Sequence, residues 1–394
     1  MKVASVVGAR PQFIKLGMID GAIGALNNRG VDRIDHQVIH TGQHYDANMS
    51  QCFFDELGLP AADVNLGIGS GSHGEQTGQM LSQLDRWLDA ARPDVVLTYG
   101  DTNSTLAAAL AAAKLHIPVA HVESGLRSRN KSMPEEINRV LTDHASMFLF
   151  CPTKTAVRNL QQEGFSNPLF EGELAPLGFE EPDRIASVDA PWVVNVGDVM
   201  YDSVLQHVCR AKARGFTDPT LRSLAVNHAV LTVHRADNTD NAKLLRSILE
   251  AAQSIAQDGI AVFFPIHPRT RQAIKRASLD SLLAGLMSVE PVSYYDMLLL
   301  VQRAEFVLTD SGGLQREAFM LGTPCVTLRR ETEWVELLDT GISELGGTDP
   351  KEILDAVDRV RGATVKGPVS PYGDGHAAQR IMAAVSTWWR DAAT

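Results

Sequence analysis

The sequence predicts an α/β protein built from two domains, each a parallel sheet covered by helices. Three observations lead to this prediction. The chain has 394 residues, enough for two domains of ordinary size. Short apolar runs alternate with helix-length segments along the chain. Within these runs apolar residues occupy consecutive positions, which is typical of strands buried on both faces of a sheet.

The apolar runs give the expected strands in order. Those in the first half are residues 3–7, 37–41, 95–98, 117–121 and 147–151. The second half repeats the pattern at residues 193–196, 229–233, 261–266, 306–309 and 325–328. Residues 164–191 lie between the halves, contain several prolines and acids, and show no usable period. We interpret them as a linker or insertion.

This pattern predicts two doubly wound, Rossmann-like domains and a terminal helix. The first domain is expected over residues 1–185 and the second over residues 186–371. Residues 372–394 are expected to contain a C-terminal helix whose Ile381, Val385, Trp388 and Trp389 are available for one packed face. That face could dock on the first domain.

Composition excludes several classes of protein. The net charge is −11 and the sequence pI is near 5.5. Nucleic-acid binding is disfavoured because it needs an excess of Lys and Arg on one face. The four cysteines lie far apart and form no Cys-x-x-Cys pair. Reduced thiols and a cytoplasmic location are therefore expected. The first apolar run is too short for a signal peptide or a membrane span, so no membrane partner is expected.

Two acids stand immediately after neighbouring apolar runs. Asp101 lies in Gly-Asp-Thr after residues 95–98, and Glu123 lies in His-Val-Glu-Ser-Gly after residues 117–120. An alanine-rich helix is expected between them. In open α/β sheets ligands bind outside the carboxyl ends of the strands, so both acids should face one crevice. The sequence therefore predicts a paired-acid site.

A third acid is expected near this site. Pro134 is followed by Glu135 and Glu136, and acids in a first helical turn suit the helix dipole. The alternative is that one of them turns toward Asp101 and Glu123. Carboxylates packed side by side repel each other, which raises the pKa of at least one of them. A carboxyl group needs such a raised pKa to donate a proton at neutral pH.

Basic residues mark the turn after the first strand. Arg10 and Lys15 lie at a helix start, where free amide donors also point outward. The segment either captures an anionic group, such as a diphosphate, or leaves both cations solvated.

A second candidate anion site follows the strand at residues 306–309. Gly312 and Gly313 let a phosphate approach the backbone, Ser311 can donate to it, and Glu317 can bind a ribose diol. His234 and Arg235 end another strand of the same half and add an imidazole and a guanidinium to this edge. We expect these residues to form a nucleotide-diphosphate cradle.

A metal site is not expected. His44, Asp101, His121 and Glu123 could be collected as ligands, but no helix-spaced pair of histidines supports this interpretation.

Eight segments together resemble the non-hydrolysing UDP-N-acetylglucosamine 2-epimerases, in the same order and over nearly the whole chain. The segments are residues 8–15, 40–44, 100–102, 121–127, 134–136, 234–235, 311–317 and 332–333. The resemblance implies a GT-B architecture with an active site in the cleft between two Rossmann-like domains. It also implies interconversion of UDP-N-acetylglucosamine and UDP-N-acetylmannosamine, no redox cofactor, a homodimer, and a role in cell-surface polysaccharide biosynthesis.

The resemblance also implies roles for particular residues. The catalytic acids fall on Asp101, Glu123 and Glu135, with His234 nearby. The contacts to the diphosphate and the ribose fall on Arg10, Lys15, Ser311, Gly312, Gly313 and Glu317, beside Arg235. Gln43 and His44 match residues that line a second, activating UDP-sugar site in some bacterial members.

The sequence departs from the family pattern at two places. Ser124 replaces the alanine of the usual Val-Glu-Ala-Gly motif, and residues 332–336 read Thr-Glu-Trp-Val-Glu where many members have Thr-Glu-Arg-Pro-Glu. These features also resemble the sister enzymes that epimerise UDP-2,3-diacetamido-2,3-dideoxyglucuronate. A GT-B glycosyltransferase or a UDP-sugar sensor would use the same nucleotide cradle, so both remain compatible with the sequence.

Overall fold

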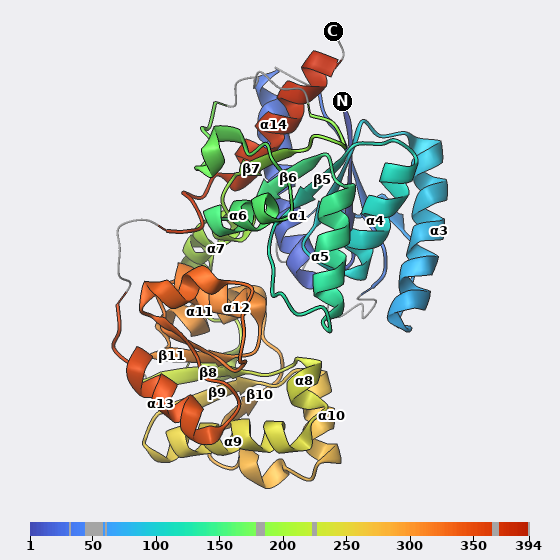
Figure 1. Cartoon of the computed structure of the whole chain (residues 1–394). Helices are drawn as coiled ribbons and strands as arrows, with labels where there is room; N and C mark the ends of the chain where they lie inside the picture. Colours follow the sequence, from blue (N-terminus) through green and yellow to red (C-terminus); the bar gives the residue numbers. More distant parts are fainter. Residues whose placement is uncertain are drawn as a thin grey trace. The chain divides into compact units, whose positions relative to one another are not determined.

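The computed structural model describes residues 1–30, 33–43, 58–59, 61–178, 186–222, 227–364 and 370–392. The chain divides into two compact units (Figure 1). Unit 1 comprises Met1–Ser203 together with Ser370–Thr394, and unit 2 comprises Val204–Val369. Each unit holds one parallel sheet with helices between the strands, which confirms the predicted class of two Rossmann-like α/β domains. His44 lies outside the described residues.

Unit 1 contains a seven-stranded sheet in the order β3-β2-β1-β4-β5-β6-β7. The strands are β1 (Lys2–Val7), β2 (Asp35–His40), β3 (Val64–Asn65), β4 (Val95–Tyr99), β5 (Val119–Val122), β6 (Phe148–Cys151) and β7 (Trp192–Asn195). The helices are α1 (Arg10–Arg29), α3 (His73–Ala91), α4 (Asn103–Lys114), α5 (Pro134–Ala145), α6 (Lys154–Gln162), η1 (Leu169–Gly172), the start of α7 (Val199–Arg214), and α14 (Ala377–Ala392). Figure 1 shows α1 and α14 side by side.

The strands expected in the first half are confirmed within one or two residues at each end. The run at residues 193–196, which the sequence pattern assigns to the second half, is β7 and pairs with β6 in the sheet of unit 1. Unit 2 begins within the next helix, α7, at Val204. Composition alone does not show this because β7 is as apolar as the strands that follow it.

Unit 2 contains a six-stranded sheet in the order β10-β9-β8-β11-β12-β13. The strands are β8 (His228–Thr232), β9 (Ala261–Pro265), β10 (Met287–Val289), β11 (Phe306–Thr309), β12 (Cys325–Thr327) and β13 (Ser343–Leu345). The helices are η2 (Pro219–Leu221), α8 (Ala236–Thr239), α9 (Ala242–Gln257), α10 (Pro268–Arg276), η3 (Asp280–Leu283), α11 (Tyr294–Arg303), α12 (Gly312–Met320), η4 (Val335–Thr340) and α13 (Pro350–Val360). The edge strands β3, β10 and β13 were not predicted, since each has only two or three residues.

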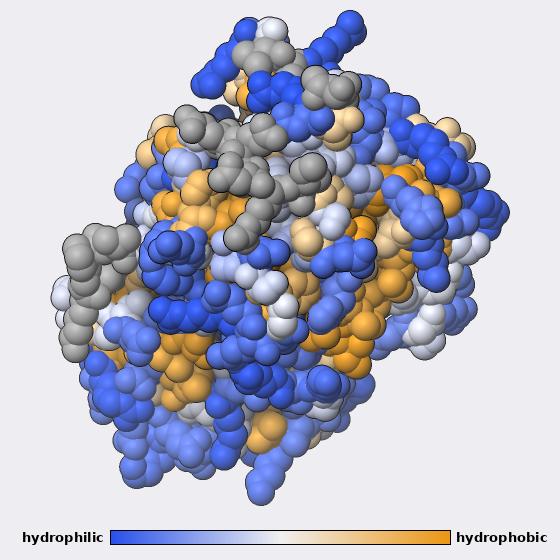
Figure 2. Space-filling view, turned by 45° about the horizontal axis from the view of Figure 1, so that its top comes forward, coloured by the Kyte–Doolittle hydropathy of each residue, from blue (hydrophilic) through white to orange (hydrophobic). Residues whose placement is uncertain are grey.

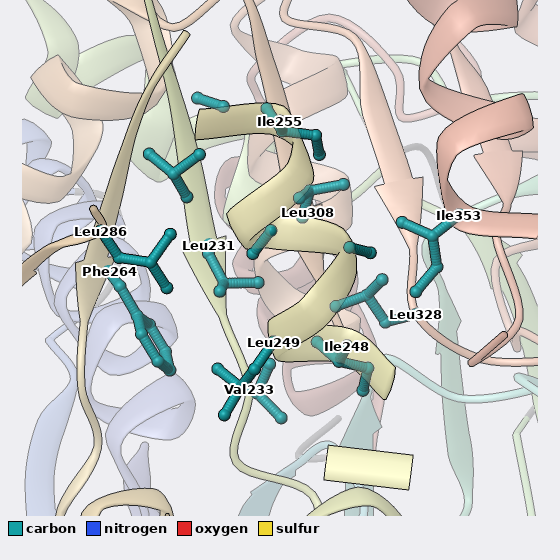
Figure 3. Close-up of a cluster of buried hydrophobic side chains, with 14 of the residues drawn as sticks. Leu231, Val233, Ile248, Leu249, Ile255, Phe264, Leu286, Leu308, Leu328 and Ile353 are labelled. Carbon is teal, nitrogen blue, oxygen red and sulfur yellow. The ribbon is translucent and has the colours of Figure 1, made fainter. Parts of the chain in front are cut away.

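The core of unit 2 shows why the second sheet forms. Leu249 on α9 and Leu231 on β8 belong to one buried apolar cluster, to which neighbouring strands add Phe264 and Leu308 (Figure 3). These side chains are almost completely buried. Burying each one removes apolar surface from water and stabilises the fold by about 1.5–3 kcal/mol.

Figure 2 shows one face, on which hydrophilic residues predominate and hydrophobic ones gather in separate patches. Within the described ranges, no helix is both long enough and apolar enough to cross a membrane.

Asp202 connects the first turn of α7 to the start of α14. Its Oδ1 accepts the N–H of Ala377 at 3.0 Å and its Oδ2 accepts the N–H of Ala378 at 2.8 Å. Burial raises the pKa of Asp202 to about 7, and the nearby negative charge of Asp198 adds to this rise, although the two backbone N–H groups oppose it. The folded protein therefore holds a proton here that the unfolded chain releases.

We expect the unfolding free energy to fall between about pH 4 and pH 7. An unfolded aspartate ionises near pH 3.9, whereas folded Asp202 keeps its proton up to about pH 7. In this window the native state binds more protons, so stability declines as pH rises, by about 4 kcal/mol at most. Urea denaturation of Asp202→Asn should give a flatter pH profile. An unchanged pH profile of the unfolding free energy would contradict the raised pKa of Asp202. Asp358→Asn, at an exposed position, is the control.

Candidate active site

The turns after β4 and β5 carry the two predicted acids and are tied to neighbouring strands. Gly100 has φ +65°, and its N–H donates to the carbonyl oxygen of Val122 at 3.0 Å. Glu123 has φ +77°, a left-handed conformation that is costly for a residue with a side chain. Its N–H and that of Ser124 both donate to the carbonyl oxygen of Phe150, at 3.1 Å each. The sheet thus imposes the position of Glu123.

Lys15 forms an ion pair with Glu123. The lysine reaches from α1, and its side chain is only 2% exposed against 10% for that of Glu123. A Cβ atom added at Gly100 would lie 3.6 Å from the Nζ of Lys15, so the ammonium also lies beside the β4 turn. The sequence pattern placed this lysine on an anionic ligand; the structure places it on a predicted catalytic carboxylate.

Asp101 is held by α5. Its Oδ2 accepts from Nη2 of Arg139 at 2.5 Å, and its carbonyl oxygen accepts from Nδ2 of Asn138 at 2.9 Å. The carboxylate is 29% exposed, so it remains open to solvent on one side. Asp101 is therefore both anchored and accessible.

Glu135 and Glu136, which the sequence alone could not tell apart, have different surroundings. Glu136 is buried and accepts the N–H groups of Ser128 and Arg129 at 2.9 and 2.8 Å and Nη1 of Arg139 at 2.9 Å. Burial by itself would raise the pKa of Glu136, but these donors outweigh it and lower the pKa. Glu136 thus has a structural role, whereas Glu135 is half-buried. The catalytic role of Glu135 stays a prediction.

Sequence reasoning missed a chain of buried charges behind these acids. Nδ1 of His121 lies 2.6 Å from Oδ1 of Asp143, and Nη1 of Arg127 lies 2.8 Å from Oδ2 of Asp143. Arg127 also donates through Nε and Nη2 to the carboxylate of Glu163, at 2.7 and 2.6 Å. The only sign of these contacts in the sequence was that the positions buried by α5 are polar.

In unit 2, Asp310 organises the loop after β8. The carboxylate is completely buried and accepts the N–H groups of His234 and Arg235 at 3.0 Å each and Nδ2 of Asn238 at 3.1 Å. The ring of His234 is 40% exposed, with Nδ1 3.4 Å from Asp310. His234 and Arg235 are therefore held through their backbone. Asp310 was not among the predicted site residues.

Ser311 caps the start of α12. Its Oγ accepts the N–H of Leu314 at 3.3 Å. A Cβ atom at Gly312 would lie 2.5 Å from Oε1 of Glu333, a buried carboxylate that pairs with Arg329 at 2.9 Å and Arg235 at 3.6 Å. A methyl group at position 312 would therefore force the buried carboxylate of Glu333 to shift. Gly313 and the buried Glu317 follow in the same helix.

The remaining predicted residues divide as follows. Oε1 of Gln43 accepts from Oγ of Ser104 at 2.6 Å, which ties Gln43 to the start of α4. The backbone of Arg10 starts α1, but the side chain of Arg10 and the whole of His44 lie outside what the structure describes. No group of three or more His, Cys, Asp or Glu side chains within the described ranges could hold a metal ion.

Each unit thus contributes one kind of site. Unit 1 presents carboxylates at the ends of β4 and β5, and unit 2 presents a glycine-containing helix start beside an imidazole and a guanidinium. Two Rossmann-like domains with these features are typical of α/β enzymes of the GT-B class.

Comparisons with known proteins identify the family. The model of the UDP-N-acetylglucosamine 2-epimerase family matches residues 26–386. The UDP-2,3-diacetamido-2,3-dideoxy-D-glucuronate 2-epimerase of Pseudomonas aeruginosa is 44% identical over 381 residues, covering 97% of this chain and 98% of the relative. The UDP-N-acetylglucosamine 2-epimerase of Methanocaldococcus jannaschii is 40% identical, with 97% and 98% covered.

Solved structures agree. The crystal structure of the Methanocaldococcus jannaschii enzyme in complex with UDP-GlcNAc and UDP has a TM-score of 0.83 at 40% identity, with 98% of this chain and 99% of that chain covered. The chain therefore belongs to the UDP-N-acetylglucosamine 2-epimerase family. It is an isomerase, rather than a glycosyltransferase or a sensor.

We expect Gly312→Ala to destabilise the protein by about 1–3 kcal/mol, because the methyl group would meet the buried carboxylate of Glu333. Gly313→Ala is the matched control: its Cβ would lie 3.8 Å from Oγ of Ser311, an ordinary contact, and alanine favours the helix. Urea denaturation of both variants measures the difference. Equal stability of the two variants would contradict the packing argument.

Proposed function

We propose that this protein interconverts UDP-N-acetylglucosamine and UDP-N-acetylmannosamine by inverting C2 of the sugar. The observation that carries the proposal is the pair of acids, Asp101 and Glu123, held at the ends of adjacent strands in a chain of this family. Anchored carboxylates at a sheet edge are suited to proton transfer at a fixed point.

The chemistry requires an elimination. The C2 hydrogen has no adjacent ketone to acidify it, so its removal must accompany departure of UDP from C1. The C2–H and C1–O bonds break, a C1=C2 double bond forms to give a glycal, and the proton goes to a protein base. UDP then adds back to C1 as C2 is protonated on the opposite face. This sequence needs acid/base groups on both sides of the ring.

Unit 1 is proposed to supply these groups. An ammonium in contact with Glu123 favours its ionised form, which suits a base. We assign Glu135 as the partner in proton transfer and Asp101 as the residue that orients the sugar. The anchoring of Asp101 by Arg139 supports an orienting role, because the contact fixes the carboxylate without covering it.

Unit 2 is proposed to bind UDP and stabilise its departure. Ser311, Gly312 and Gly313 would cradle the diphosphate at the start of α12, and Glu317 would bind the ribose. His234 and Arg235 would balance the charge that gathers on UDP as the C1–O bond breaks. A preorganised donor of this kind is typically worth about 3 kcal/mol in the transition state.

A second candidate substrate is UDP-2,3-diacetamido-2,3-dideoxyglucuronate. The 44% identity to the Pseudomonas aeruginosa enzyme favours it, against 40% for the Methanocaldococcus jannaschii UDP-N-acetylglucosamine enzyme. The two sugars share the acetamido group at C2 and differ at C3 and C6. The same acids would serve either substrate.

We also propose a homodimer, a cytoplasmic location, an effector role for Gln43 and His44, and a place in cell-surface polysaccharide biosynthesis. The support is the family to which the chain belongs. Light scattering of the purified protein would test the oligomeric state.

Incubation of the protein in D2O with each UDP-sugar separately tests the function. We expect deuterium at C2 and a new manno-configured C1 signal by NMR, because the proton returned to C2 comes from exchangeable groups. The substrate that exchanges faster is the physiological candidate. Absence of C2 exchange with both sugars would refute the proposal.

Amide substitutions test the acids. Glu123→Gln, Asp101→Asn and Glu135→Gln should each slow C2 exchange by roughly 10²–10⁴-fold while UDP affinity stays within a few fold, since proton transfer is lost and the cradle is untouched. Calorimetry with UDP gives the affinity. Glu75→Gln, on the exposed start of α3, is the control for substitution itself. If all three variants exchanged the C2 hydrogen at the wild-type rate, the proposal that these acids act on C2 would be refuted.

A further inference from the structure

The α5 helix buries its polar side chains and exposes its apolar ones. Glu136, Asn138, Arg139, Thr142 and Asp143 are all buried. Ile137 and Leu141, by contrast, are 46% and 45% exposed. A helix that merely covers a sheet turns its apolar residues inward. The reversed pattern requires a reason within unit 1, where the buried side chains meet the acid-bearing turns.

Asp143 is the centre of these contacts. Its Oδ1 meets Nδ1 of His121 at 2.6 Å, and its Oδ2 accepts the N–H of Gly125 at 3.1 Å and lies 2.8 Å from Nη1 of Arg127. Glu123 lies between His121 and Gly125 in the chain. One fully buried carboxylate therefore contacts the residues two positions before and two positions after Glu123.

His121 also contacts the turn that carries the other acid, Asp101. Its Nε2 lies 2.7 Å from the carbonyl oxygen of Gly100, the residue before Asp101. A carbonyl oxygen only accepts, so Nε2 must carry hydrogen. Nδ1 faces Asp143, which already accepts from two other donors. Arg127 pairs with the Asp143 carboxylate and favours its ionised, acceptor-only form, so Nδ1 carries hydrogen as well.

We propose that Asp143 and a His121 that carries hydrogen on both ring nitrogens are positioning residues for C2 epimerisation, which set the turns of Glu123 and Asp101 relative to each other. This inference rests on the proposed function for its kinetic consequence only. The two residues do not touch the reacting sugar in this account; they act through the backbone of the acids. Asp101 receives a second anchor from Arg139 on the same helix.

The protonation state can be tested without any activity. In ¹⁵N-labelled wild-type protein at about pH 7.5, where a free imidazole is mostly neutral, both ring nitrogens of His121 should show one-bond N–H couplings. Loss of the signals in His121→Gln assigns them. A His121 ring nitrogen without hydrogen would overturn the proposal, whether or not the protein epimerises a UDP-sugar.

If Asp143 acts as a positioning residue, its replacement should lower kcat and leave KM nearly unchanged. Asp143→Asn keeps the shape of the side chain but releases the turns, and a displacement of about 1 Å can slow a reaction roughly 100-fold. We expect kcat to fall by about that factor while KM and UDP affinity stay within about 3-fold. The matched variant Glu163→Gln removes the outer carboxylate, which is 30% exposed, and should change kcat by less than about 3-fold.

Folded Asp143→Asn protein with wild-type kcat, or an equal loss in both variants, would overturn the positioning role. If Asp143→Asn does not fold, the ring couplings of wild-type His121 decide the matter. If wild-type protein exchanges no C2 hydrogen, the proposed function fails, and the couplings still test the buried cation independently.

Discussion

The site of unit 1 depends on the pairing of buried charge. Glu123 lies against Lys15, Asp101 against Arg139, and Asp143 between His121 and Arg127. A carboxylate removed from water is stable only when such partners replace its hydration. The same partners fix the geometry, because each cation comes from a different element. The positions of the proposed catalytic acids and the stability of the fold are thus set by the same contacts.

Unit 2 also relies on a buried, paired carboxylate at the carboxyl ends of its strands. Asp310, at the end of β11, holds the backbone of the loop after β8, much as Asp143 holds the turn after β5. In both units a buried aspartate accepts a backbone N–H hydrogen bond from a turn that follows a strand. Both sheets therefore hold these turns by one structural principle.

The sequence predicted those parts that depend on local pattern. Apolar runs located the central strands, and the rule for strand ends placed Asp101 and Glu123 at adjacent strand ends. Pairings that span long separations were beyond its reach: nothing local shows that Lys15 meets Glu123, that Asp143 meets His121, or that β7 joins the first sheet. The difference between Glu135 and Glu136 likewise depends on which of them meets the N–H groups of residues 128 and 129.

A crystal structure of Glu123→Gln with the UDP-sugar bound would test the central claim most directly. The account predicts that C2 of the hexose lies within about 3–3.5 Å of the side chain at position 123, with the carboxylate of Glu135 on the opposite face of the ring. A complex in which these side chains lie remote from C2, while UDP occupies its cradle, would contradict it.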